Sequence, residues 1–158
     1  MVKQIILPIA AVCAFIILVG LMFKNPEKFN FSKKQSSVFI NDKKVDVSLA
    51  DNDEKRAKGL GGVSLLGKDS GMLFVFSTKD VKPVFWMKDM IIPIDIIWIN
   101  DDKIVQIDKN IKAPQPKTPD NKIERFTPQG VIDYVLEVNA GFSDTNNIKV
   151  GDPVRITF

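Results

Sequence analysis

An uncharged apolar segment from Ile5 to Phe23 most strongly constrains what this chain can form. Its 19 residues, IILPIAAVCAFIILVGLMF, are long enough for a membrane-spanning helix. Such a helix would be about 28 Å long, close to the roughly 30 Å hydrocarbon core of a bilayer. A cleaved signal peptide has a shorter apolar region, followed by a site of small residues, whereas this segment ends in bulky residues and Lys24. We therefore expect residues 1–24 to be an uncleaved transmembrane anchor that contacts the membrane through residues 5–23.

The charges that flank this segment leave its orientation open. Lys3 precedes the segment, and more lysines follow it than precede it, namely Lys24, Lys28, Lys33 and Lys34. The positive-inside rule taken alone would place the following domain in the cytoplasm, but the rule weakens for long domains, which cross largely regardless of charge. The absence of Cys after Cys13 agrees with an oxidising exterior without requiring one.

Composition excludes several kinds of chemistry. The 158 residues include no His and one Cys, so the chain has no Ser-His-Asp or Cys-His nucleophile system, no His/Cys zinc site and no intramolecular disulfide. Residues 25–158 hold 20 Lys+Arg and 19 Asp+Glu with the signs interspersed, whereas proteins that bind nucleic acid usually carry a basic surface. We therefore expect no cofactor, no metal and no nucleic-acid partner.

Short apolar runs separated by turn residues make up most of the remaining chain. Residues 25–37 are polar and rich in Lys, which is typical of a juxtamembrane linker. Residues 38–158 are enough for one β-rich domain with a single core. Short runs of apolar, β-branched and aromatic residues predict strands at 37–40, 44–49, 72–76, 84–87, 94–100, 103–109, 134–139 and 154–158.

One short helix interrupts this pattern of strands. Residues 51–54 supply an N-cap and an acidic first turn, residues 55–58 continue the helix, and Gly59 can end it. The elements together predict a mostly β fold, a compact antiparallel β-barrel or sandwich with one short helix, preceded by a single transmembrane helix. Residues 110–128 contain four prolines and are predicted to be a long loop, in which Ile123 and Phe126 are able to dock onto the domain.

Asp95 is the most unusual polar residue of the predicted strands. In residues 94–99 the side chains of Ile94, Ile96 and Trp98 share one face, and Asp95 shares the other with two isoleucines. Because both faces are apolar, we expect a central strand with Asp95 partly buried, and a buried carboxylate needs a partner. Arg56 and Lys88 are the candidate partners, and the sharpest hypothesis is an Arg56–Asp95 ion pair that joins the helix to this strand.

Two further groups of residues stand out. Period-two alternation in residues 135–140 places Glu137 and Asn139 on one face, where they line a polar cleft if the 110–128 loop covers them and are solvated if it does not. Met72, Met87 and Met90 occur close to Trp86. Thioethers are soft ligands that suit Cu(I), but packing against aromatic side chains is their usual role, and we favour packing.

Six ordered motifs resemble those of the domain of unknown function 192 family of bacteria and archaea. They cover most of residues 45–158 and read Arg56-x-x-Gly59-Leu60, Gly71-Met72-Leu73-Phe74-Val75-Phe76, Phe85-Trp86-Met87-Lys88, Ile92-Pro93-Ile94-Asp95-Ile96-Ile97, Val135-Leu136-Glu137-Val138-Asn139-Ala140-Gly141 and Val150-Gly151-Asp152. The family more usually has Asn-Thr where this chain has Asp89 and Met90.

The resemblance implies a compact, mostly β single domain that is often exported behind a signal sequence or an anchor. It thereby favours an extracytoplasmic domain, and it implies no activity because the family has no established one. The family motif positions carried over here form either a ligand site or the framework of the fold, and they are Arg56, Gly59, Met72, Trp86, Met87, Lys88, Pro93, Asp95, Glu137, Asn139 and Gly141.

Two hypotheses about function follow. We favour a membrane-anchored, non-catalytic binding or accessory module of the cell envelope that recognises a small polar ligand or a glycan. Its candidate ligand-binding residues are Arg56, Trp86, Lys88, Asp95, Glu137 and Asn139. The alternative is a carboxylate-dependent hydrolase acting on envelope polymers, with Asp95 and Glu137 as its acid and base.

Overall fold

A computed structural model describes residues 36–158, so the expected anchor at residues 1–24 and nearly all of the linker lie outside the described residues. Among residues 36–158, no helix combines the length and the apolar character needed to cross a membrane. The described part is mostly β. Its strands are β1 (Ser36–Ile40), β2 (Lys43–Ala50), β3 (Ser70–Val75), β4 (Phe85–Trp86), β5 (Ile94–Asn100), β6 (Lys103–Ile111), β7 (Arg125–Phe126), β8 (Tyr134–Asn139) and β9 (Val154–Thr157).

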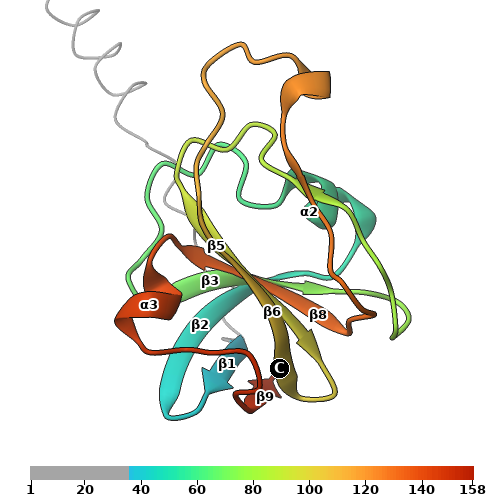
Figure 1. Cartoon of the computed structure of the whole chain (residues 1–158), viewed down its shortest axis with the longest axis vertical. Helices are drawn as coiled ribbons and strands as arrows, with labels where there is room; N and C mark the ends of the chain where they lie inside the picture. The colour runs from blue at the N-terminus through green and yellow to red at the C-terminus, as the bar shows by residue number, and fades with distance from the viewer. Residues whose placement is uncertain (1–35) are drawn as a thin grey trace, which may run out of the picture. The chain divides into compact units, whose positions relative to one another are not determined.

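Seven of these strands form one curled sheet, a half-barrel, in the order β6-β5-β8-β3-β2-β1-β9. In Figure 1, helix α2 and the 110–128 loop lie above the central strands of this sheet, and its edge strand β9 lies at the bottom. The sheet does not close into a complete barrel, although hydrogen bonds link its two edges at one end. There the Ile104 N–H donates to the Asp152 carbonyl at 3.0 Å, and the Gly151 N–H donates to the Ile104 carbonyl at 2.8 Å.

The expectation of an antiparallel sheet is wrong for one pair of strands. β2 and β3 run parallel, with Leu49 opposite Leu73, whereas every other neighbouring pair in the sheet is antiparallel. A parallel pair needs a crossover connection rather than a tight turn. Residues 51–69 provide that connection, and α2 (Asp53–Lys58) is part of it.

Helix α2 begins and ends where the sequence predicts. The side chain of Asn52 accepts a hydrogen bond from the Lys55 N–H at 2.9 Å, and Asp53 and Glu54 occupy the first turn. Gly59 ends the helix with φ +50° and ψ −138°, a positive φ that glycine tolerates. The structure adds two short helical turns that were not expected, η1 (Asp120–Lys122) and α3 (Phe142–Thr145).

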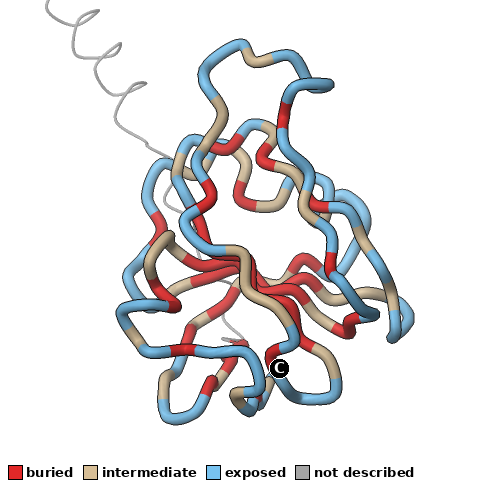
Figure 2. Tube along the Cα trace, viewed as in Figure 1, coloured by how far each residue is buried: buried red, intermediate tan, exposed pale blue. Residues whose placement is uncertain are grey.

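Two apolar clusters cover the two faces of the sheet, and Figure 2 shows the buried chain concentrated in the central strands. The alternation predicted for β5 is confirmed, since Ile94, Ile96 and Trp98 belong to one cluster and Ile97 and Ile99 to the other. The first cluster lies beneath α2 and the long loops. Its buried members are Ala50, Leu60, Leu66, Met72, Phe74, Phe85, Met87, Met90, Ile94, Ile96, Trp98, Ile111, Ile123, Ile132 and Val135.

The 110–128 loop is docked rather than detached. Ile123 is buried, and Phe126 packs against the first cluster. Within this loop β7 pairs with β4, so that Phe126 lies opposite Phe85 and Arg125 opposite Trp86. The loop therefore helps to hold the segment that carries Trp86.

Candidate functional site

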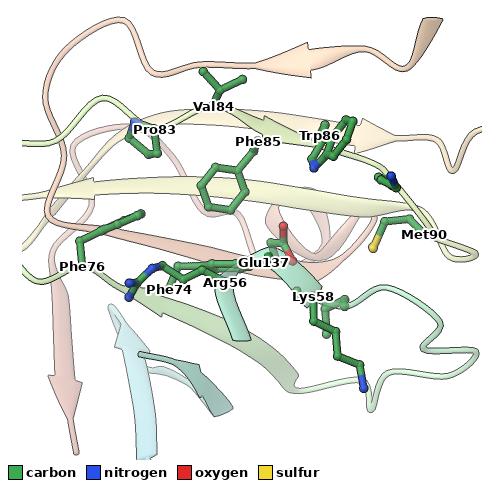
Figure 3. A pocket seen from close by; sticks show the side chains of 14 residues that line it. Arg56, Lys58, Phe74, Phe76, Pro83, Val84, Phe85, Trp86, Met90 and Glu137 are labelled. Carbon is green, nitrogen blue, oxygen red and sulfur yellow. The ribbon is translucent and has the colours of Figure 1, made fainter. Parts of the chain in front are cut away.

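A pocket of about 280 Å³ opens between α2, the β4 segment and the sheet face that carries the first apolar cluster. Figure 3 shows the Glu137 carboxyl near its centre, with Phe85 above it and Met90 to one side. The walls are apolar and the cationic residues are Arg56, Lys58 and Lys88. The complete lining is Arg56, Ala57, Lys58, Gly59, Leu60, Phe74, Phe76, Pro83, Val84, Phe85, Trp86, Lys88, Met90 and Glu137.

Glu137 reaches the pocket because of its register in the middle of the sheet. It lies on β8 opposite Met72 of β3 on one side and Ile96 of β5 on the other. Directly opposed residues share a face, so the Glu137 side chain stands between two buried apolar side chains. Gly59 lies beside it, since a Cβ at this position would make ordinary van der Waals contact with Glu137 Oε2 at 3.9 Å and with the Phe74 ring at 3.5 Å.

The Glu137 carboxyl is buried without a hydrogen bond or a cation that would offset the cost of removing it from water. The residue is 5% exposed, and its Oε2 atom has no hydrogen-bond partner. Burial raises the pKa of Glu137 to about 8, because leaving water disfavours the charged form and no nearby cation offsets that cost. The carboxyl is therefore mostly protonated at neutral pH.

The cations at the mouth of the pocket are partly paired. The Arg56 guanidinium donates to the Val75 carbonyl at 2.7 Å and forms an ion pair with the exposed Asp53 at 2.6 Å. Lys88 forms a 2.6 Å ion pair with Asp120 of the long loop, and this hydrogen bond raises the pKa of Lys88. Lys58 is exposed and takes part in none of the ion pairs found within residues 36–158.

Trp86 lines the pocket, but two cations already lie against its ring. Lys88 Nζ lies 5.1 Å from the ring centroid, and the Arg125 guanidinium carbon lies 5.0 Å from it. Both distances are within the range of cation–π attraction. The ring thus helps to hold the positive charge at the mouth.

Asn139 is on the predicted face but does not line the pocket. Its side-chain amide donates to the carbonyl oxygens of Leu66 and Gly67 at 3.2 and 2.9 Å. These bonds tie the crossover segment before β3 to the end of β8. The position of Asn139 in the structure is explained by this role in the framework.

The predicted ion pair between Arg56 and Asp95 is wrong, because the structure does not form it. Asp95 is fully buried and accepts hydrogen bonds from the backbone N–H groups of Asn110 at 2.8 Å, Gly141 at 3.1 Å and Ser143 at 2.9 Å. Three backbone donors satisfy the carboxylate without a cation. Its partners lie on β6 and at the start of α3, away from the pocket.

The acid–base pair of the hydrolase hypothesis is likewise not assembled. Glu137 lies opposite Ile96, whereas Asp95 lies opposite Val138, so the two carboxyl groups point to opposite faces of the sheet.

The methionines pack as expected: Met72, Met87 and Met90 are all buried in the first cluster. Met90 also lines the pocket.

The sequence reasoning therefore found four pocket residues, Arg56, Trp86, Lys88 and Glu137, and missed several others. Phe74 and Phe85 were predicted only as strand residues, yet their rings pack edge to face with centroids 4.7 Å apart and form part of the wall. Lys58 was predicted only as part of the helix. The available signal was its position two residues after Arg56, next to Gly59.

Comparisons with known proteins support the fold. A crystal structure from Sinorhizobium meliloti 1021, described as that of a candidate transcription regulator, is 25% identical, with a TM-score of 0.67 over 82% of this chain and 97% of that chain. A protein of unknown function from Novosphingobium aromaticivorans DSM 12444 is 30% identical, with a TM-score of 0.63 over 77% of this chain and 83% of that chain. No curated protein matches the chain.

The family comparison accounts for almost all of the described residues. Residues 36–156 match the model of DUF192, whose description is "Uncharacterized ACR". These residues include the strands that carry the pocket, the helix α2 beside it and the loop that docks over it. The chain therefore belongs to the DUF192 family.

Proposed function

We propose that this protein is a non-catalytic binding module for a small ligand, which occupies the pocket above Glu137. The observation that carries the proposal is the buried Oε2 atom of Glu137, which has no hydrogen-bond partner at the centre of a pocket. Buried polar groups in proteins are almost always hydrogen-bonded, and an unsatisfied one is costly. A ligand that hydrogen-bonds to the carboxyl would remove that cost.

The shape and lining of the pocket support a small ligand rather than a polymer. A volume of about 280 Å³ is just below the roughly 300–1,000 Å³ that is typical of small-molecule sites. Apolar walls with few polar groups are also typical of such sites. A glycan is less well supported, because Lys88 and Arg125 already lie against the Trp86 ring on which a sugar would stack.

We also propose that a transmembrane segment at residues 5–23 anchors this module in the cell membrane, with the domain outside the cytoplasm. The support is the 19-residue uncharged segment together with the export that the family resemblance implies. Protease added to intact cells should then degrade the domain. Protection in intact cells, with digestion only after lysis, would place the domain in the cytoplasm instead.

We do not extend the transcription-regulator description of the Sinorhizobium meliloti protein to this chain. Residues 36–158 hold 17 Lys+Arg and 18 Asp+Glu, which is a slight net negative charge. Nucleic-acid binding draws most of its affinity from neutralising phosphates with clustered basic residues. The charge balance supports a small-molecule ligand better than a polyanion.

A fragment screen on the full-length chain in detergent tests the binding proposal. A ligand that binds only the folded state raises its melting temperature. Compounds that do so should lose their effect in Glu137→Gln and keep it in Glu124→Gln, which makes the same change at an exposed position. A complete screen with no Glu137-dependent compound would contradict the proposal.

A further inference from the structure

The distribution of charge in and around the pocket indicates which class of ligand it takes, given the binding function proposed above. A single carboxyl lies deep in the pocket, and the only charged residues besides it in the lining are Arg56, Lys58 and Lys88. We propose that the pocket binds a small zwitterion, with its ammonium group on Glu137 and its anionic group among these three cations.

The deep end of the pocket suits an ammonium group. Glu137 is flanked in the sheet by Met72 and Ile96, so nothing charged lies beside it there. An ammonium group brings both the hydrogen-bond donor that Oε2 lacks and the positive charge that would stabilise the ionised carboxylate in a site with little water. The neighbouring rings of Phe74 and Phe85 add apolar surface for the methylene groups of such a ligand.

The outer end suits an anion. Arg56 uses part of its guanidinium for the Val75 carbonyl and for the fully exposed Asp53, a pair that contributes little in water. Lys58 is exposed and forms none of the ion pairs in the described part of the chain. Burial is the cause of the raised pKa of Glu137, so these cations do not offset the desolvation of the deep carboxyl. Figure 3 shows the charged ends of Arg56 and Lys58 pointing away from it.

A ligand with only one of the two charges fits the pocket less well. A simple amine would have to pass three cations at the mouth, and a simple carboxylate would meet the Glu137 carboxyl at the deep end. A zwitterion with its two charges separated by a short apolar chain places its ammonium group on the Glu137 carboxyl and its anionic group near the outer cations of the pocket. Amino acids with a terminal amine and aminoalkyl phosphates are compounds of this class.

Isothermal titration calorimetry on the full-length chain in detergent tests whether the ligand is a small zwitterion. The probes are straight-chain amino acids from 4-aminobutyrate to 8-aminooctanoate, with 2-aminoethyl phosphate to compare phosphate with carboxylate. Each amino acid has two matched controls, the alkylamine that lacks the anion and the fatty acid that lacks the amine; for 6-aminohexanoate these are hexylamine and heptanoate. We expect one chain length to bind at least about tenfold more tightly than both of its matched controls, because each control loses one charged contact.

Variants and pH sharpen the same experiment. Glu137→Gln should lose at least about tenfold in zwitterion affinity. Lys58→Ala should weaken binding of the zwitterion without weakening that of hexylamine, from which it removes a repelling charge. Lys149→Ala, at an exposed site in another loop, should change neither. Glu137 gives up its proton to buffer when the ammonium binds, so apparent affinity should rise by up to about tenfold per pH unit as pH approaches 8.

The outcomes separate this inference from the binding function on which it rests. The zwitterion inference would be overturned if hexylamine or heptanoate binds as tightly as the zwitterion. It would also be overturned if the zwitterion still binds to Glu137→Gln with wild-type affinity. The small-ligand proposal would still stand if the fragment screen yields a Glu137-dependent compound of another charge. It would fall with the zwitterion inference if the screen yields none. Circular dichroism of Glu137→Gln confirms that the variant used in both tests is folded.

Discussion

Asp95 and Glu137 are two buried carboxyl groups on adjacent strands of one sheet, and they differ in almost every other respect. Asp95 accepts three backbone hydrogen bonds, whereas Glu137 has a buried oxygen with no partner. Asp95 faces the cluster that includes Phe142, and Glu137 faces the pocket. The difference teaches that burial of an acid by itself does not mark a site. The informative feature is a buried acid whose hydrogen bonds the protein leaves unmade.

The largest expected effect is the loss of stability when the hydrogen-bonded Asp95 is removed. Asp95→Ala should destabilise the domain by about 3–5 kcal/mol, because it leaves three backbone N–H groups without their acceptor. Unfolding of the full-length chain by urea measures this loss. Asp95→Asn keeps an acceptor and should lose less. A loss below about 1 kcal/mol for Asp95→Ala would show that this carboxylate does not hold α3 and β6 together.

The next effect is the pH dependence of stability at Glu137. Its pKa is raised from 4.5 to about 8 on folding, so between these values the unfolded chain has released a proton that the folded protein still holds. The stabilising contribution of the proton is complete below pH 4.5 and is lost as pH rises through 8. Wild type should therefore lose about 2–5 kcal/mol over this window.

Two variants show whether Glu137 causes that loss. Glu137→Gln has no proton to release, so its free energy of unfolding should change much less between pH 4.5 and 8 and exceed that of wild type above pH 8. Glu124→Gln should keep the wild-type slope. Equal slopes in wild type and Glu137→Gln would show that the Glu137 carboxyl is not desolvated in the folded protein.

A smaller effect tests whether the two carboxyl regions are independent. Arg56→Ala removes a partly buried hydrogen bond to the Val75 carbonyl and an exposed ion pair, and should cost about 1 kcal/mol. Because Arg56 does not contact Asp95, the double variant Arg56→Ala/Asp95→Ala should lose the sum of the two single losses within about 0.5 kcal/mol. A coupling energy well above that value would show that Arg56 and Asp95 interact, as the sequence hypothesis of an ion pair predicted.

The smallest effect concerns the exposed Lys88–Asp120 pair at the mouth of the pocket. Lys88→Ala should leave the urea midpoint unchanged within error, since exposed ion pairs contribute little to stability. The same variant should weaken binding of a zwitterionic probe in calorimetry. A large shift in the midpoint with unchanged binding would place Lys88 in the framework instead of the site.

Much of the fold could be predicted from the sequence because it depends on local pattern. The period-two alternation in β5 and β8 put the correct residues on each face, and the Asn52 to Gly59 segment specified α2 through its caps. The parallel pairing of β2 with β3 could not be read in the same way. Alternation defines the faces of a strand but not which strand lies beside it or in which direction.

For the site, the sequence by itself determined which residue types are present and which residues of the same strand share a face with Asp95 and with Glu137. The register of β5 with β8 decided that the two carboxyl groups point to opposite faces of the sheet. Only the tertiary structure decided what surrounds each carboxyl. The donors to Asp95 are backbone N–H groups 15 to 48 residues away, and backbone groups leave no trace in the residue type. The pocket around Glu137 is built from α2, β3, the β4 segment and β8. Its lining and the missing partner of Glu137 therefore come from packing between distant segments, which local pattern does not encode.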